Sequence, residues 1–150
     1  MINLEIIERA EPSAEWLETF KQYAAVADAS QDSLLRAMLL RAILRVQEMA
    51  DTSILACTFR LEEEDAEEGV RLYQSVKEVL SVKDRMGYNV PFIHEGRKVL
   101  APYEFVEVTY TTEPSAAAID DLMPIVYQYA TALYDGQDSK SLANILTQCR

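Results

Sequence analysis

The stretch FVEVTYTTEP, Phe105–Pro114, is the clearest structural signal in the sequence, because its pattern is that of a strand that leads directly into a helix. Apolar Val106, Val108 and Tyr110 alternate with polar residues, a pattern typical of a half-buried strand. Its final proline opens a long apolar helical pattern that ends at Tyr134. The stretch therefore predicts a strand-to-helix unit with one buried strand face.

Length and composition predict one globular domain over residues 1–150. Hydrophobic residues make up 49% of the chain and charged residues 26%, which is ordinary for a soluble domain and unlike a disordered chain. The formal net charge of −11 argues against broad nucleic-acid affinity, because phosphate binding depends on Lys and Arg. This charge is compatible with DNA passing nearby without binding, or with a basic protein partner.

The cysteines and the N-terminal residues predict a protein that is cytoplasmic or is made in the cytoplasm. With only Cys57 and Cys149, no disulfide framework is expected, and a reducing compartment is favoured. Residues 1–12 lack the apolar core of a signal peptide. The run LLRAMLLRAILRV, residues 34–46, contains three arginines and is too charged to span a membrane.

Hydrophobic periodicity predicts two helices in the N-terminal third of the chain, well before the stretch Phe105–Pro114. The first begins at Pro12–Ser13, and its apolar stripe extends to Ala27. The second covers about Ser33–Ala50 and is apolar on most of its circumference. Such a helix is expected to be buried in a core, in a subunit contact, or in both.

Strand-forming residues between these helices and the stretch Phe105–Pro114 predict a small antiparallel sheet. Ser53–Leu61 reads as one strand and Val70–Asp84 as one or two strands. Arg85–Pro102 contains two glycines and two prolines, and predicts a loop with a short hairpin that turns at Glu95–Gly96.

The C-terminal third predicts two more helices. The first covers Ser115–Tyr134, and Pro124 inside it should kink or split it, since proline removes one backbone hydrogen bond. The second covers Ser139–Gln148. Two helices, a small antiparallel sheet and two helices together predict an α+β domain that is mostly helical.

The acidic run EEEDAEEG, Glu62–Gly69, allows two interpretations. Divalent cations bind converging carboxylates, and Glu63 and Glu67 would share one face of a helix, as in helical nucleotide pyrophosphohydrolases. The second acidic motif would then have to be Asp120–Asp121. The other interpretation, which we favour, is a solvated hairpin tip between two strands.

The remaining polar residues do not assemble a catalytic site. His94 has no nucleophile near it in the sequence, so we expect it in a loop without a catalytic partner. The four glycines are scattered singly, which rules out a phosphate-cradling loop of the usual type. We therefore expect neither an enzyme nor a bound cofactor or metal.

Three residues are candidates for a subunit interface. Arg41 and Arg45 share one flank of the second helix, where they could bind a partner or pair with neighbours such as Glu48. Tyr129 faces away from the apolar stripe that holds Tyr127, and aromatic residues are enriched where subunits meet.

Several stretches in a fixed order carry a resemblance to a known family. DSLLRAMLLRAILRVQEMADTSILACTFRL (32–61) matches an aspartate-led apolar helix that ends before a strand, and SVKEVLSVKD (75–84) matches a strand region with valines three apart. FVEVTYTTEP and ATALYDG (130–136) match a V-x-V-x-Y strand, a proline-led helix and an "LY" near its end. SLANILTQCR (141–150) matches a short terminal helix that ends in arginine. Over almost its whole length the chain resembles the head–tail connector proteins of long-tailed bacteriophages.

This resemblance implies a structural virion protein made in the host cytoplasm. It would form a homo-oligomeric ring, commonly of twelve subunits, between the portal protein and the tail or stopper proteins. The ring would extend the DNA channel without binding DNA specifically. The terminal segment would dock on the portal through Leu142, Ile145, Leu146 and Arg150. The lumen would be lined either by the loop Arg85–Pro102 or by acidic candidates, namely Glu62, Glu63, Glu64, Asp65, Glu67 and Glu68.

Two alternatives stay open from the sequence. One is a metal-dependent nucleotide pyrophosphohydrolase that uses Glu63, Glu67 and Asp121. The other is a small acidic module that binds a basic protein partner.

Overall fold

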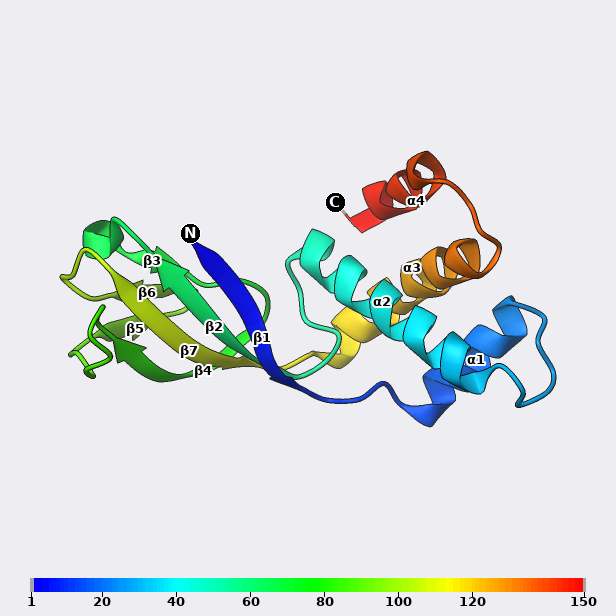
Figure 1. Cartoon of the computed structure of the whole chain (residues 1–150), viewed down its shortest axis with the longest axis horizontal. Coiled ribbons are helices and arrows are strands. Elements are labelled where there is room, and N and C mark those ends of the chain that lie inside the picture. The colour runs from blue at the N-terminus through cyan, green and yellow to red at the C-terminus, as the bar shows by residue number, and fades with distance from the viewer. Residues whose placement is uncertain (1, 150) are drawn as a thin grey trace. The chain divides into compact units, whose positions relative to one another are not determined.

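The computed structural model describes residues 2–149, which form two compact units. The strand unit consists of residues 2–10 and 55–113, and the helical unit of residues 11–54 and 114–149. Each unit is therefore built from two separate stretches of the chain (Figure 1). Helices account for 42% of the chain and strands for 26%, so the predicted α+β class is confirmed. The prediction of a mostly helical chain slightly overstated the helical share.

The strand unit contains a four-stranded antiparallel sheet in the order β1-β2-β7-β4. Its strands are β1 (Asn3–Arg9), β2 (Cys57–Glu63), β7 (Val106–Thr112) and β4 (Val76–Lys83). The alternation predicted for Phe105–Pro114 is confirmed in β7, because the residues between its buried positions are only half-buried. The buried positions are Val106, Val108, Tyr110 and Thr112. This central strand therefore places one sheet face against the core.

A second antiparallel sheet has the order β3-β6-β5. It is formed by β3 (Val70–Arg71), β6 (Lys98–Leu100) and β5 (Ile93–Glu95). The predicted hairpin is confirmed, since β5 and β6 pair around a turn at residues 96–97 in which Gly96 adopts a φ of +57°. The prediction of a loop position for His94 was wrong, because that residue lies within β5.

Two features of the strand unit differ from the prediction. β1 was not predicted, because Leu4 and Ile6 are followed by a bulge between Ile6 and Glu8 that interrupts the alternation. The acidic run is also not a hairpin tip. β2 ends at Glu63 and the chain passes through a 3₁₀ turn, Ala66–Glu68, into β3, which belongs to the other sheet.

The helical unit contains α1 (Ala14–Tyr23), α2 (Asp32–Ala50), α3 (Ala116–Tyr134) and α4 (Ser139–Leu146), followed by a 3₁₀ turn at Thr147–Cys149. The predicted helices are confirmed with small shifts of their ends. Of the two outcomes predicted at Pro124, a kink or a split, the split is wrong, because α3 is one helix through this residue. Pro124 lies on the exposed side of α3, and α2 packs along the helix, so tertiary packing outweighs the loss of one backbone hydrogen bond.

Side chains on three helices fill the core of the helical unit. The completely buried residues include Phe20 from α1, four aliphatic residues from α2, and two residues from α3, namely Leu35, Leu39, Ile43, Val46, Val126 and Ala130. Lys21 Nζ lies 2.9 Å from Asp32 Oδ1, which ties α1 to the start of α2. Within residues 2–149, no helix is both long and apolar enough to cross a membrane.

Gln47 fastens the C-terminal end of α2 to the segment that follows it. Its side chain is buried, and Oε1 accepts a hydrogen bond from the Ile54 backbone N–H at 3.1 Å. We expect Gln47→Met, which keeps the shape but removes the acceptor, to lower the free energy of unfolding by about 1–3 kcal/mol, because a buried donor loses its partner.

The measurement for Gln47→Met is urea unfolding followed by circular dichroism. Gln22→Met, on the exposed side of α1, is the matched control and should change stability by less than about 0.5 kcal/mol. Equal stability of the Gln47→Met and wild-type proteins would contradict the assigned role of this hydrogen bond.

Candidate subunit-interface surface

An open hollow of about 450 Å³ lies on the helical unit between α2 and α3. Its lining comes from one face of α2 and from a single residue of α3, namely Ala37, Leu40, Arg41, Leu44, Arg45, Glu48 and Tyr129. Residues three and four apart share a helix face, so the spacing of the α2 members follows directly from helical geometry. We call this surface the α2 hollow.

The lining of the α2 hollow is apolar apart from two arginines and one glutamate. Leu40 and Leu44 are half-buried, and Ala37 is exposed. Tyr129 reaches the hollow from α3 and is only 5% exposed. A concave apolar surface with an aromatic residue is the arrangement in which partner side chains become desolvated on binding.

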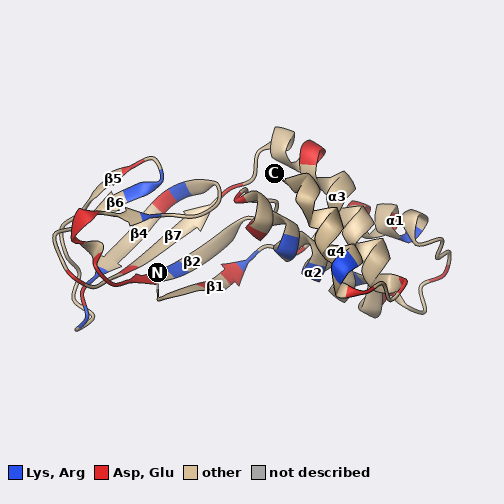
Figure 2. Cartoon of the chain, turned by 90° about the horizontal axis from the view of Figure 1, so that it is seen from above, with Lys and Arg blue, Asp and Glu red and all other residues tan. Residues whose placement is uncertain are grey.

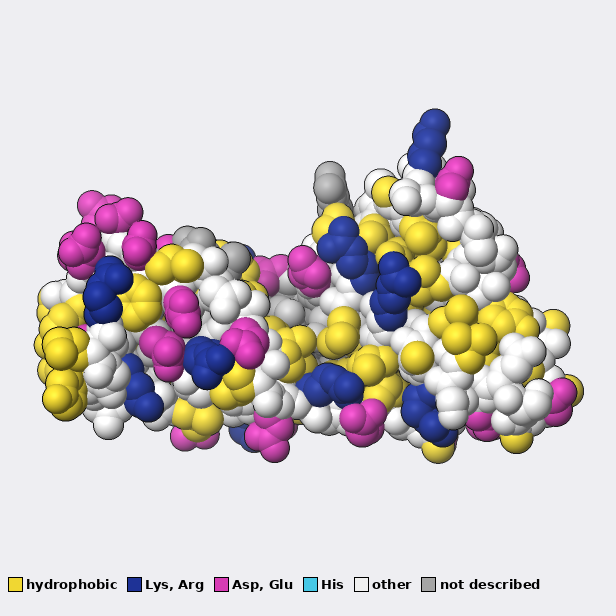
Figure 3. All heavy atoms as spheres, in the orientation of Figure 1, with side chains coloured by type: hydrophobic (Ala, Val, Ile, Leu, Met, Phe, Trp, Pro, Cys, Tyr) yellow, Lys and Arg dark blue, Asp and Glu magenta, His cyan; other side chains and the backbone are white. Residues whose placement is uncertain are grey.

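Two arginines give the α2 hollow a net positive charge on a chain that is acidic as a whole. Arg41 and Arg45 are both exposed and bring two positive charges to the lining, against one negative charge from Glu48. Arg45 Nη1 lies 3.4 Å from Glu48 Oε2, an exposed ion pair that contributes little to stability. Figure 3 shows basic side chains set among hydrophobic ones on the visible face of the helical unit. On a chain of net charge −11, such a surface suits an acidic partner with apolar groups.

The structure brings together the three residues predicted for the subunit interface. Arg41, Arg45 and Tyr129 all line the α2 hollow. Tyr127 lies on another side of α3, where it stacks on Tyr23 with ring centroids 5.0 Å apart. Sequence reasoning missed Leu40 and Leu44, although their spacing of four residues beside the two arginines was a usable signal.

The residues predicted to dock on the portal lie on and after α4. Leu142 and Ile145 are half-buried and present part of their surface to solvent. Leu146 is buried within the helical unit, so its side chain already contributes to the packing of the chain itself. Arg150 lies outside the described residues.

Asp138 caps α4 and should make this helix pH-dependent. Its Oδ1 accepts a hydrogen bond from the Ser141 backbone N–H at 2.9 Å, which holds the pKa of the carboxyl below its usual range. The cap is therefore fully stabilising above the ordinary aspartate pKa of about 4, and is lost as pH falls through the lower folded-state value.

We expect the Asp138 carboxyl signal to titrate below the usual aspartate range in carbon-13 NMR, with the Ser141 amide shifting in step. Asp138→Asn keeps a good N-cap but cannot titrate, so α4 should stay folded while the pH dependence disappears. A Ser141 amide that moves equally in both proteins would contradict this assignment.

The acidic candidates for the lumen occupy one end of β2 and the segment after it. Glu62 and Glu63 lie in β2 and are half-buried, whereas the other four are exposed. Figure 2 shows acidic residues along the loops of the strand unit. Glu64 Oε1 lies 3.8 Å from Arg85 Nη2, so the acidic run and the loop Arg85–Pro102, the two alternatives for the lumen, meet at this point.

The loop Arg85–Pro102 carries exposed apolar residues that the sequence analysis did not single out. Met86, Tyr88, Phe92 and Ile93 are all exposed. Phe92 and Ile93 also line a shallow groove of about 350 Å³.

The shared helix face expected for Glu63 and Glu67 in a metal-dependent pyrophosphohydrolase is not formed by these two residues. Glu63 lies in a strand and Glu67 in a 3₁₀ turn, so the two do not share a helix face. Asp121 lies on α3 in the helical unit. Across residues 2–149, no three His, Cys, Asp or Glu side chains are placed to hold a metal ion.

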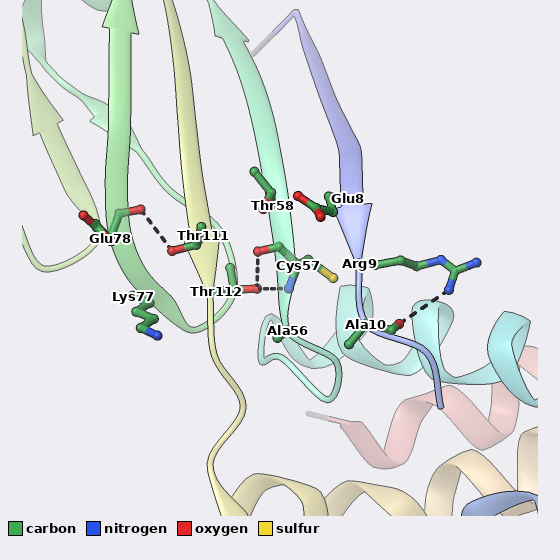
Figure 4. A pocket seen from close by; sticks show the side chains of 10 residues that line it. All are labelled: Glu8, Arg9, Ala10, Ala56, Cys57, Thr58, Lys77, Glu78, Thr111 and Thr112. Atoms are coloured by element: carbon green, nitrogen blue, oxygen red, sulfur yellow. Dashed lines mark hydrogen bonds between the residues drawn. The ribbon is translucent and has the colours of Figure 1, made fainter. Parts of the chain in front are cut away.

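A further hollow, of about 410 Å³, lies at one end of the four-stranded sheet (Figure 4). Thr112 Oγ1 accepts a hydrogen bond from Cys57 N–H at 3.2 Å and lies 3.4 Å from Cys57 O. The Cys57 thiol lies 3.5 Å from the Leu55 carbonyl oxygen, which it can donate to. These side chains contact backbone groups of neighbouring strands and loops. The residues that line the hollow include no histidine that could activate the Cys57 thiol.

Comparison with known proteins gives a match at the level of structure only. No protein-family model and no curated protein match the sequence. A chain in the solved structure "Neck of empty GTA particle computed with C6 symmetry" is 16% identical, with a TM-score of 0.69, and the match covers 99% of this chain and 95% of that one. A chain in "Virion of native gene transfer agent (GTA) particle" is also 16% identical, with a TM-score of 0.67 over 100% and 95% of the two chains.

A third match has the same character. A chain in "Neck of native GTA particle computed with C12 symmetry" is 14% identical, with a TM-score of 0.55 over 96% of this chain and 95% of that one. At such low identities the shared property is the fold. The protein therefore has the α+β fold of chains found in the neck and virion of gene transfer agent particles, in agreement with the head–tail connector fold that the sequence resemblance implied.

Proposed function

We propose that this chain is a structural component of the head–tail interface of a phage-like particle. In this role the whole chain, residues 1–150, acts as one connector domain, and identical copies form a ring between the portal and the tail or stopper proteins. The observation that carries the proposal is the fold match to neck chains over 99% of this chain. The protein works through shape and packing, so it needs no catalytic group, metal or cofactor.

A ring of twelve copies is the stoichiometry that we propose. Two of the similar neck structures bear the symmetries C6 and C12 in their names, and both symmetries are those of closed rings. Each copy in such a ring presents one surface to the preceding copy and a different surface to the following copy. The α2 hollow provides one of these surfaces, since it combines leucines, a tyrosine and arginines on an acidic chain.

The portal and the DNA would then meet other parts of the chain. Leu142 and Ile145 have exposed surface available for docking on the portal, together with the terminal Arg150. The acidic run Glu62–Glu68 is our choice for the lumen, because its carboxylates repel DNA phosphates over about 8–10 Å at ordinary salt concentrations. DNA can then slide through the channel without being held.

The experiment is to mix the purified chain with its cognate portal protein and examine the mixture by negative-stain electron microscopy. We expect portal particles with an added ring on one end, and a monomeric chain in the absence of the portal if assembly needs a template. Bare portals at saturating concentrations of the chain would contradict the proposal. The chain with Leu142→Lys and Ile145→Lys, which changes half-buried side chains and keeps the buried Leu146, is the matched control and should form no portal-bound ring.

A further inference from the structure

The four-stranded sheet has two open edges. β1 and β4 are the outer strands (Figure 1), and within residues 2–149 no other strand pairs with the outer edge of β1. The C-terminal end of β4 is partly covered by the chain that follows it. Val90 N–H donates a hydrogen bond to Val82 O at 3.0 Å, and Lys83 forms a β-bridge with Asn89. The open part of β4 is therefore the segment 76–81.

Both open edges expose large apolar side chains. Ile2, Ile6 and Ile7 lie on or beside β1, and the Ile7 side chain is 45% exposed. Leu80 on β4 is 52% exposed. Soluble proteins usually protect edge strands with charges, prolines or a covering segment, because open backbone groups invite pairing with another chain. Apolar residues on two open edges therefore indicate that another strand covers these edges in the working assembly.

The directions of the strands make the two edges complementary to each other. All neighbouring strands are antiparallel, and there are four of them, so β1 and β4 run in opposite directions. If β1 of a second copy is placed against β4 of the first with the two sheets in the same orientation, the new pair is again antiparallel. The pairing uses a different edge of each copy, so it can be repeated from copy to copy and can close into a ring.

The faces and charges of the two edges agree with this pairing. At one edge of the sheet, Leu4 and Ile6 lie on the same face as Leu61 and Phe59. At the opposite edge, Val79 lies on that same face, beside Tyr110. A joined sheet would therefore place apolar residues next to apolar residues on the core face. β1 carries two glutamates and one arginine, whereas the open segment of β4 carries one lysine and one glutamate and is neutral. No excess of like charge on the two facing strands therefore opposes the pairing.

We propose that β1 of one copy pairs with β4 of the next copy and joins the sheets of neighbouring subunits into one continuous antiparallel sheet. This inference rests on the proposed ring and names a second contact within it. The α2 hollow and the joined sheet would connect the same two subunits, one contact for each unit of the chain.

The first test is cysteine cross-linking between copies. In a Cys149→Ser background, which leaves only the buried Cys57, Glu5→Cys and Ser81→Cys place one thiol on each edge. The full chain is assembled on the portal and treated with a short bismaleimide. We expect the doubly substituted chain to give a ladder of dimers, trimers and larger species, because each copy links to two neighbours. Each singly substituted chain should stay monomeric.

Other outcomes of the cross-linking identify other occupants of the edges. A dimer from the Glu5→Cys chain alone would indicate two-fold pairing of β1 with β1, and would overturn the proposal. Cross-links to the portal protein in place of a ladder would show that another protein covers the edge, and would also overturn it.

The second test uses exposed residues whose replacement leaves the monomer intact. Ile7→Lys and Leu80→Lys each add a charge at an open edge, and each should weaken assembly by at least about tenfold, measured as the concentration needed for half-saturation of the portal. Met86→Lys, at an exposed apolar residue in the turn after β4 and outside its open segment, is the matched control and should assemble like the wild type.

The two proposals fail in different ways. Normal rings from the Ile7→Lys and Leu80→Lys chains would overturn the edge pairing and leave the proposed function intact. A wild-type chain that forms no ring on the portal would contradict the proposed function. In that case, a cross-linked ladder from the chain alone at high concentration would still support the pairing, and monomers alone would end both proposals.

Discussion

Replacement of both Arg41 and Arg45 by glutamate is expected to weaken ring assembly by about 100-fold or more. The two changes replace the positive charge of the α2 hollow with negative charge and move the net charge of the chain from −11 to −15. A neighbouring acidic copy would then meet like charges, which costs several kcal/mol at a contact, and each 1.4 kcal/mol is a factor of ten in affinity. The measurement is the concentration of chain that half-saturates the portal.

The fold of this double variant should be preserved, because both arginines are exposed and make no contact that the core needs. Arg36→Glu is the matched control, since it reverses an exposed arginine on the same helix outside the hollow. It should reduce assembly much less than Arg41→Glu alone. Unchanged assembly of the double variant, with its circular dichroism spectrum intact, would show that the hollow is not a subunit contact.

Tyr110→Ala is expected to lower the free energy of unfolding by about 3–5 kcal/mol, the range for removal of a large aromatic residue from a core. Tyr110 is completely buried in β7, and its ring stacks on Phe59 with centroids 5.5 Å apart. Its hydroxyl accepts a hydrogen bond from Tyr73 N–H at 3.1 Å and lies 3.3 Å from Tyr73 O. The residue therefore joins the central strand of the large sheet to the segment between β3 and β4.

Tyr110→Phe separates the two contributions of this residue. It keeps the stacked ring but leaves the Tyr73 N–H without this acceptor, so the expected loss is about 1–3 kcal/mol. Urea unfolding gives all values, and Tyr88→Ala, at an exposed tyrosine, should stay within about 0.5 kcal/mol of the wild type. A loss for Tyr110→Ala no larger than that for Tyr88→Ala would contradict the assignment of Tyr110 to the core.

The sequence predicted those elements whose hydrophobic period is regular. β7 alternates without interruption, and α2 and α3 each keep an apolar stripe over 19 residues. β1 escaped prediction because it is an edge strand with a bulge, so neither of its faces is uniformly apolar. The acidic run was read as a hairpin tip because its local composition does not reveal that β2 pairs with β7, 43 or more residues later in the chain, and not with β3.

The candidate interface was predictable in part. The spacing of Arg41 and Arg45 placed both on one flank of α2, and Tyr129 was separated from Tyr127 by its helical phase. The hollow itself needs the packing of α3 against α2, which brings Tyr129 beside residues about 85 positions earlier in the chain. Leu146 shows the opposite case. Its place on the apolar face of α4 was clear, but that face packs against the chain itself.

The discontinuous make-up of the two units has a consequence for synthesis on the ribosome. Every residue of the strand unit has been translated once residue 113 is added, whereas the helical unit still lacks α3 and α4. At about 5–20 residues per second, the nascent chain therefore spends some seconds with the apolar stripes of α1 and α2 unshielded. During that interval these two helices are the segment that chaperones or premature contacts between polysomal neighbours would reach first.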